Sequence, residues 1–164
     1  MNFKLCSKSL YFLGLFCFFL IAAPLFSGGA EQIKIEDIKA IFPEGASIEK
    51  ASGSIWFLVF NKDRKLVGKA ALTSPYCDDI KGYGGAIPLL VGVDTKDEIR
   101  GIIILPNKET PGIVDVINKS GFLDSFIGFK LEDLDKKHID SVTGATITSE
   151  AIIKILKVFY KKAK

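Results

Sequence analysis

Apolar residues recur along the chain with two different periods, which predict helices near both ends of a domain and strands between them. Residues 35–43 and 150–162 carry apolar side chains three and four positions apart, the spacing of one helix face. These positions are Ile35, Ile38, Ile41 and Phe42 in the first segment, and Ile152, Ile155, Leu156 and Phe159 in the second. Pro43 ends the first helix because proline cannot continue it.

Four short segments between these helices are typical of β-strands. Residues 54–60 and 66–72 are rich in aromatic and β-branched side chains, and the polar turn NKDRK joins them into one hairpin. Residues 86–94 and 99–105 form a second hairpin and are almost continuously apolar, which indicates strands covered on both faces. Residues 113–128 fit one or two short helices. We therefore expect an α+β fold, an antiparallel sheet built from hairpins with flanking helices.

An apolar segment precedes this domain. Two lysines stand before Leu10–Phe26, a run of 17 residues without a charge. The pattern is that of a secretory signal peptide with a cleavage site after Ala30, and the run also has the minimum length of a membrane-spanning helix. Residues 1–30 are thus a cleaved signal peptide or a single membrane anchor. In either case we expect residues 31–164 on the extracytoplasmic side, because the lysines stay inside.

Charge and side-chain chemistry exclude several classes of function for residues 31–164. The chain has 22 basic and 19 acidic residues, and two of the basic ones precede residue 31, so the domain is nearly neutral. That balance gives no basic footprint for nucleic acid. Cys77 is the single cysteine of the domain, so no internal disulfide is possible. One histidine, His138, leaves no zinc or haem ligand set, and we assign no catalytic or metal-binding residue.

The eleven residues DSVTGATITSE, Asp140–Glu150, hold five Ser or Thr side chains around a Gly-Ala pair. One interpretation is a helix start, in which Thr148 or Ser149 caps the last helix and Gly144 makes the turn into it. Capping accounts for one or two of the five hydroxyls. The other interpretation is an anion site, since the free N–H groups and dipole of a helix N-terminus favour a phosphate. A phosphate-sized group would then bind near Thr146.

Residues 140–146, DSVTGAT, resemble the flavinylation motif of the extracytoplasmic FMN-binding domain family. That family includes the G subunit of the Rnf electron-transport complex and the C subunit of the sodium-translocating NADH:quinone reductase. KGYGG at residues 81–85 and ETPG at residues 109–112 resemble two further segments of the family, in the same order. The resemblance extends over nearly the whole domain, about residues 35–160. The family often has a histidine shortly before ETPG. This chain departs from that pattern, because Asn107 and Lys108 stand there.

The resemblance implies that FMN is attached through its phosphate, as a phosphoester, to Thr146, with Thr143 as the competing acceptor. It also implies that a separate, magnesium-dependent flavin transferase installs the FMN from FAD. The cofactor-binding residues implied in this way are Asp140, Ser141, Thr143, Gly144, Ala145, Thr146 and Thr148, the loop residues Glu109, Thr110, Pro111 and Gly112, and Tyr83, Gly84 and Gly85. An ordinary turn and a glycine-rich start of a strand are the plain structural alternatives for the last two sets.

The function implied is that of an extracytoplasmic electron carrier with covalent FMN. It would be one component of an Rnf-type complex, with other membrane subunits as partners, or a freestanding carrier that exchanges electrons with redox partner proteins. Two other classes stay open. One is a flavin-dependent reductase of a small extracytoplasmic acceptor, and the other is a non-redox module in which the motif is only a helix cap.

Overall fold

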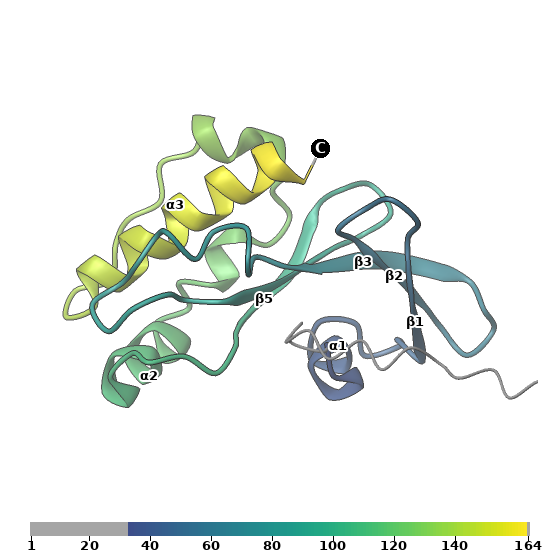
Figure 1. Cartoon of the computed structure of the whole chain (residues 1–164), viewed down its shortest axis with the longest axis horizontal. Helices are drawn as coiled ribbons and strands as arrows, with labels where there is room; N and C mark the ends of the chain where they lie inside the picture. Colours follow the sequence, from purple (N-terminus) through teal and green to yellow (C-terminus); the bar gives the residue numbers. More distant parts are fainter. Residues whose placement is uncertain (1–32, 164) are drawn as a thin grey trace, which may run out of the picture. The chain divides into compact units, whose positions relative to one another are not determined.

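One antiparallel sheet with helices on both faces forms the centre of the domain (Figure 1). The computed structural model describes residues 33–163, so the leader expected at residues 1–30 lies outside the described residues. The five strands are β1 (Ser47–Lys50), β2 (Phe57–Phe60), β3 (Leu66–Leu72), β4 (Leu89–Val93) and β5 (Ile99–Ile104), and each pairs with the next. The helices are α1 (Ile35–Ile41), α2 (Pro111–Lys119) and α3 (Thr146–Lys162), with 3-10 helices η1 (Asp124–Phe126) and η2 (Leu131–Lys136). The α+β prediction is confirmed.

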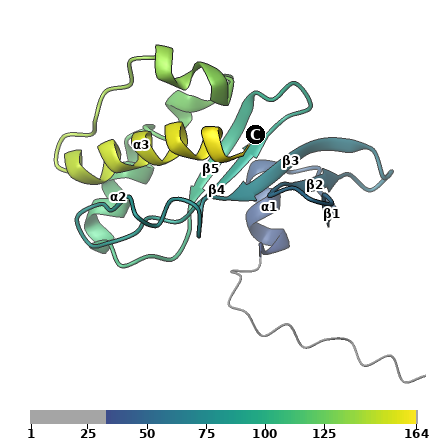
Figure 2. The same cartoon turned by 45° about the horizontal axis from the view of Figure 1, so that its top comes forward.

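Two apolar clusters, one on each face of the sheet, hold the helices. Alternate residues of β4 point to opposite faces, as strand geometry requires. Leu89 and Val91 join the cluster that contains α3, whereas Leu90 joins the cluster that contains α1. Every residue of β4 is buried, so the prediction of a strand covered on both faces is confirmed there. Figures 1 and 2 show α1 on one side of the sheet and α3 on the other.

Glycines in the two central strands make room for α1. An added Cβ at Gly68 of β3 would lie 2.5 Å from the Phe42 ring, and one at Gly92 of β4 would lie 2.5 Å from Ile41 Cγ2. Phe42 is fully buried. The helix therefore approaches the sheet closely because these two positions carry no side chain.

One edge strand of the sheet is short, and the other is paired at its first residue. β1 has four residues, and its burial pattern contains no buried position. At the other edge, the Ile99 N–H donates to Phe129 O at 2.8 Å and the Gly128 N–H donates to Ile99 O at 2.8 Å. The segment before η2 thus pairs with Ile99, the first residue of β5, and protects that end of the edge.

β2 begins at Phe57 and β4 at Leu89, each three residues later than expected. Three further elements show what the apolar pattern misses. β1 was not expected, because a short polar edge strand carries no apolar alternation. α2 begins at Pro111, a favourable first residue for a helix, rather than near Ile113. α3 begins at Thr146, four residues before the apolar period becomes visible at Glu150. In each case local backbone chemistry, and not apolar periodicity, decides the boundary.

We expect Gly92→Ala to destabilise the protein by about 1–3 kcal/mol, because the new methyl group overpacks the α1 interface. Its Cβ would lie 2.5 Å from Ile41 and 2.8 Å from Phe42. Urea unfolding followed by fluorescence of Trp56, the single tryptophan, measures the change.

Gly112→Ala is the matched control, because an added Cβ there has nothing within 4 Å. In a helix this change leaves stability equal or up to about 1 kcal/mol higher. Equal stability of Gly92→Ala and the unchanged protein would contradict the close approach of α1.

Candidate functional site

The three sequence motifs meet at one end of α3. The loop between β3 and β4 runs along this helix toward its beginning. Near the end of α3, Lys162 Nζ donates to Tyr76 O, and further along Cys77 Sγ lies 3.8 Å from Ile155 O. Both views place the far part of this loop beside the start of α3, with α2 next to it (Figures 1 and 2).

The loop also packs directly on the ETPG segment. An added Cβ at Gly84 would lie 2.8 Å from Glu109 Cα, and one at Gly82 would lie 2.7 Å from Ile87 Cδ1 and against a Glu109 carboxylate oxygen. The two glycines are therefore required by close approach, as for a backbone segment that touches another. KGYGG and ETPG, 24 positions apart in sequence from residue 85 to residue 109, form one surface.

The turn into α3 is made as the sequence predicts, but it is capped differently. Gly144 has φ +83°, which a residue with a side chain adopts only with strain. Ala145 stands at the N-cap without a side-chain hydrogen bond, and α3 begins at Thr146. Thr148 and Ser149 lie inside the first turn and are buried. The prediction that one of them caps the helix is wrong, because the helix starts before them.

Ser149 instead ties the motif to the helix. Its Oγ accepts a hydrogen bond from the Val142 N–H at 3.0 Å and lies 3.0 Å from Ala145 O, to which it donates. The side chain is fully buried. Sequence analysis did not assign Ser149 to the site. Its signal was only its place in a hydroxyl-rich stretch.

The hydroxyl of Thr146 is exposed at the start of α3. Its closest hydrogen-bond partner is Val142 O at 3.4 Å, a long and weak contact. Thr143 is exposed as well, so exposure alone does not distinguish the two acceptor candidates. The first bond of the helix is from Ser149 N–H to Ala145 O at 2.9 Å, so the N–H groups of the residues before Ser149 have no partner within the helix.

Asp140 and Ser141 lie upstream of this turn, and both are exposed. Asp140 Oδ1 is 3.0 Å from His138 Nε2, and both side chains are about nine-tenths exposed. A groove of about 520 Å³ borders this segment, and Phe122 and Phe129 line it together with Ser141. The motif thus presents a polar, open flank on the side opposite its helix.

Two buried polar side chains in the site have no hydrogen-bond partner. Among the described residues, the buried side-chain oxygens without a partner are both carboxylate oxygens of Glu109 and Oγ1 of Thr148. Glu109 is 6% exposed and Thr148 is 1% exposed. Buried polar groups are nearly always bonded in proteins, and an orphaned one is a sign of strain or of an absent ligand. Both residues belong to the set that the sequence assigned to the cofactor.

Asn107 holds the ETPG loop in place. Its Oδ1 accepts the Glu109 N–H at 2.8 Å, and its Nδ2 donates to Leu105 O at 2.8 Å. Thr110 is the N-cap of α2 and Pro111 its first residue, and neither side chain is buried. Asn107, where the chain departs from the family, therefore fixes the loop. The sequence alone did not predict this structural role.

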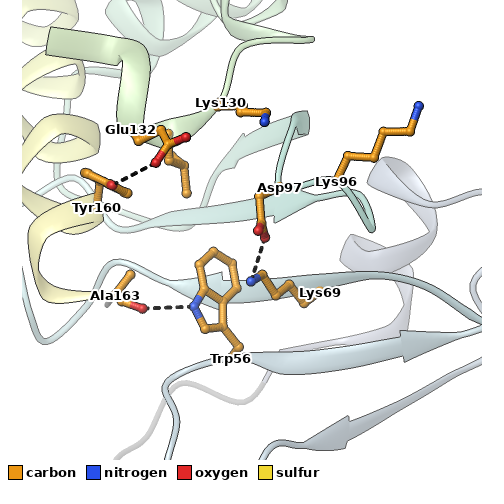
Figure 3. Close-up of a pocket in the computed structure, with 9 residues that line it drawn as sticks. Trp56, Lys69, Lys96, Asp97, Lys130, Glu132, Tyr160 and Ala163 are labelled. Atoms are coloured by element: carbon orange, nitrogen blue, oxygen red, sulfur yellow. Dashed lines mark hydrogen bonds and ion pairs between the residues drawn. The ribbon is translucent and has the colours of Figure 1, made fainter.

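The remaining reactive groups lie away from this surface. Burial raises the pKa of the Cys77 thiol, which keeps it protonated, and the side chain is 1% exposed. Residues 33–163 contain no group of three His, Cys, Asp or Glu side chains that could hold a metal ion. A cavity of about 270 Å³ lies at the last turn of α3, where Lys69 pairs with Asp97 at 2.7 Å beside Trp56 (Figure 3). Because α3 is about 25 Å long, this cavity is separate from Thr146.

Comparisons with known proteins agree with this geometry. A model of the FMN-binding domain matches residues 82–161, which include DSVTGAT, ETPG and all of KGYGG except Lys81. The G subunit of the proton-translocating ferredoxin:NAD(+) oxidoreductase complex of Clostridium ljungdahlii is 31% identical over 146 residues, 85% of this chain and 76% of the relative. The chain belongs to the family of FMN-binding proteins that are similar to the Rnf G subunit.

Two other relatives of the same family match a shorter region. The G subunit of the ion-translocating oxidoreductase complex of Shewanella baltica is 40% identical over 87 residues, 46% of this chain and 41% of the relative. The corresponding protein of Aliivibrio fischeri (strain ES114) is 36% identical over 94 residues, which are 49% of this chain and 45% of the relative. These matches span less than half the length of those relatives. Within residues 33–163, no helix has the length and apolar character needed to cross a membrane.

The FMN-binding assignment makes the start of α3 the first place to test. We expect Ser149→Ala to destabilise the fold by about 1–3 kcal/mol, because the Val142 N–H loses its acceptor. Thermal unfolding followed by circular dichroism measures the loss.

Thr146→Ala is the control, since its hydroxyl is exposed and makes only the 3.4 Å contact. Its stability should stay within about 0.5 kcal/mol of the unchanged protein. If both variants unfold alike, Ser149 does not hold the motif to the helix.

Proposed function

We propose that this FMN-carrying electron-transport protein bears its FMN covalently, through a phosphoester to Thr146, and works on the extracytoplasmic side of the membrane. One observation carries the proposal. The exposed, weakly bonded hydroxyl of Thr146 stands at the first residue of α3, where helix N–H groups are free to meet a phosphate. The leader at residues 1–30, cleaved or retained as an anchor, supports the location.

The described residues fit FMN at this place. Helix dipoles favour negative charge at their N-terminus, and Gly144 and Ala145 keep bulky side chains away from Thr146. The close packing of Gly82 and Gly84 on the ETPG loop builds a surface beside it. The unpartnered Thr148 hydroxyl in the first turn supplies a hydrogen-bonding group within the same helix end.

A flavin transferase is the partner that this chemistry requires. Thr146 Oγ1 would attack the phosphorus on the FMN side of FAD, the anhydride bond would break, and AMP would leave as the hydroxyl proton passes to a base of the transferase. Magnesium held by the transferase would neutralise the charge that develops on the phosphates. Asp140 is exposed close to Thr146 in sequence, so it can contact the transferase without leaving a buried position.

Covalent attachment keeps the cofactor on a protein that has no flavin pool around it. When bound, FMN supplies the redox chemistry, and the chain positions it. We therefore propose exchange of electrons with protein partners, either the other membrane subunits of an Rnf-type complex or redox proteins that meet a freestanding carrier. The relatives from Clostridium and Shewanella are subunits of such oxidoreductase complexes, which supports the first arrangement.

A flavin-dependent reductase of a small acceptor is the second candidate. The observation in its favour is the groove of about 520 Å³ that borders Asp140, Ser141 and Val142. Its lining includes one acid and one base, Asp140 and His138, which form a pair about nine-tenths exposed. The serines of the groove are bonded to the backbone, since Ser120 Oγ donates to Ile117 O and Ser125 Oγ to Phe122 O.

The intact mass of the protein, expressed with and without a flavin transferase, tests the attachment. We expect a gain of one FMN minus water, retained in Thr143→Ala and Thr146→Ser and lost in Thr146→Ala. The Thr146→Ala variant should fold, so a missing gain reports the acceptor and not the fold. If the mass gain persists in Thr146→Ala and disappears in Thr143→Ala, the acceptor is Thr143 and not Thr146. No gain, with a transferase that modifies a known acceptor, would reduce the motif to a helix start.

Turnover separates the carrier from the reductase. The loaded protein, reduced chemically, should pass electrons to small acceptors no faster than free FMN does, because the acid–base pair of the groove, His138 and Asp140, is about nine-tenths exposed and encloses no substrate. Ser125→Trp fills the groove without touching Thr146 and should leave this rate unchanged. Saturable turnover that Ser125→Trp abolishes would favour the reductase.

A further inference from the structure

The two most exposed large apolar side chains of the domain lie at the proposed FMN site. Among residues 33–163, Tyr83 is 70% exposed and Ile147 is 57% exposed, whereas the other exposed side chains of this kind range from 39% to 48%. Tyr83 belongs to the KGYGG loop, and Ile147 directly follows Thr146. Single exposed apolar residues are common on protein surfaces, but these two share one functional end of the molecule.

The outward position of Tyr83 is fixed by the backbone around it. Gly82 and Gly84 both face the ETPG loop so closely that a Cβ on either would collide with it. The segment is a tight turn, in which the Gly82 N–H donates to Gly85 O at 2.8 Å. The backbone of this turn packs on the ETPG loop at residues 82 and 84, and the ring of Tyr83 between them is 70% exposed.

The first turn of α3 also combines buried and exposed side chains. Thr148 and Ser149 are buried, while Thr146 and Ile147 are exposed. The acceptor hydroxyl and the Ile147 side chain are therefore both open to solvent at the helix start. Ile80 and Ile87, which flank the KGYGG turn, belong to the same apolar cluster as Ala145 before this helix.

We propose that Tyr83 is the platform on which the isoalloxazine ring of the attached FMN stacks, with Ile147 against the part of the cofactor next to its tether. The inference rests on the proposed attachment to Thr146. Aromatic rings prefer offset stacking over exposure to water. A tether makes the contact intramolecular, so even a weak stack is populated because the effective concentration is high.

This arrangement leaves one face of the ring open. A ring stacked on Tyr83 from outside keeps its other face toward solvent, since Tyr83 itself projects from the surface. An electron partner can then approach the ring directly. The chain holds the cofactor on one side and does not enclose it.

Fluorescence of the attached flavin tests the platform. A tyrosine stacked on a flavin donates an electron to the excited ring and quenches its emission, whereas phenylalanine stacks without quenching in this way. The unchanged protein, Tyr83→Phe and Tyr83→Ala are loaded by the transferase, and intact mass verifies the FMN on each. We expect both variants to emit several-fold more strongly per FMN than the unchanged protein. Only Tyr83→Ala should also lose the visible circular dichroism of an ordered ring.

Tyr76→Ala is the matched control. Tyr76 is a 39% exposed tyrosine of the same loop, but its carbonyl oxygen accepts from Lys162 at the opposite end of α3. Its emission should equal that of the unchanged protein.

Three results would overturn the inference. Fully loaded Tyr83→Ala and Tyr83→Phe with unchanged emission would show that the ring lies elsewhere, while the attachment to Thr146 stands. Failure of the Tyr83 variants alone to gain FMN would assign Tyr83 to the contact with the transferase. Failure of the unchanged protein to gain FMN would remove the attachment, and the platform with it.

Discussion

The burial of α3 against the sheet determines where every candidate residue lies. Its apolar stripe, Ile152, Ile155, Leu156 and Phe159, is fully buried, so the helix cannot rotate or slide without exposing large side chains. The helix start is held as well, because Ser149 bonds the backbone on both sides of the turn. Thr146 is therefore carried on a rigid element, and its exposed hydroxyl has a fixed direction.

The same helix orders the loop that faces it. Contacts with Lys162 and Ile155 guide the chain after β3 along the helix, and the glycines that follow dock on the ETPG loop. Three motifs that are distant in sequence become one surface through this path. Among the described residues, Glu109 and Thr148 keep buried side-chain oxygens without a hydrogen-bond partner, so packing there leaves polar groups unsatisfied.

Apolar periodicity was sufficient for the helices and central strands, and local backbone chemistry was needed for the rest. The stripe of α3 and the buried run of β4 followed directly from spacing, because tertiary burial and pattern agree there. Spacing could not find β1, which is short and polar, or the true start of α3. The roles of Ser149 and Asn107 depend on bonds to backbone groups that only a folded turn brings into reach. Resemblance to a family predicts an acceptor at Thr146, but it does not predict that Gly82 and Gly84 pack on the ETPG loop and leave Tyr83 exposed.

The short edge at β1 and the paired beginning of β5 have a consequence for encounters between molecules. A long bare strand edge offers a template on which a second chain can add a strand. Here β1 has four residues and ends in the charged pair Glu49 and Lys50, while the beginning of β5 is paired with residues 128–129. β1 therefore offers a second chain only a few backbone groups to pair with. Encounters at this edge are thereby left to side-chain surfaces, which can be brief enough for the repeated docking that electron transfer needs.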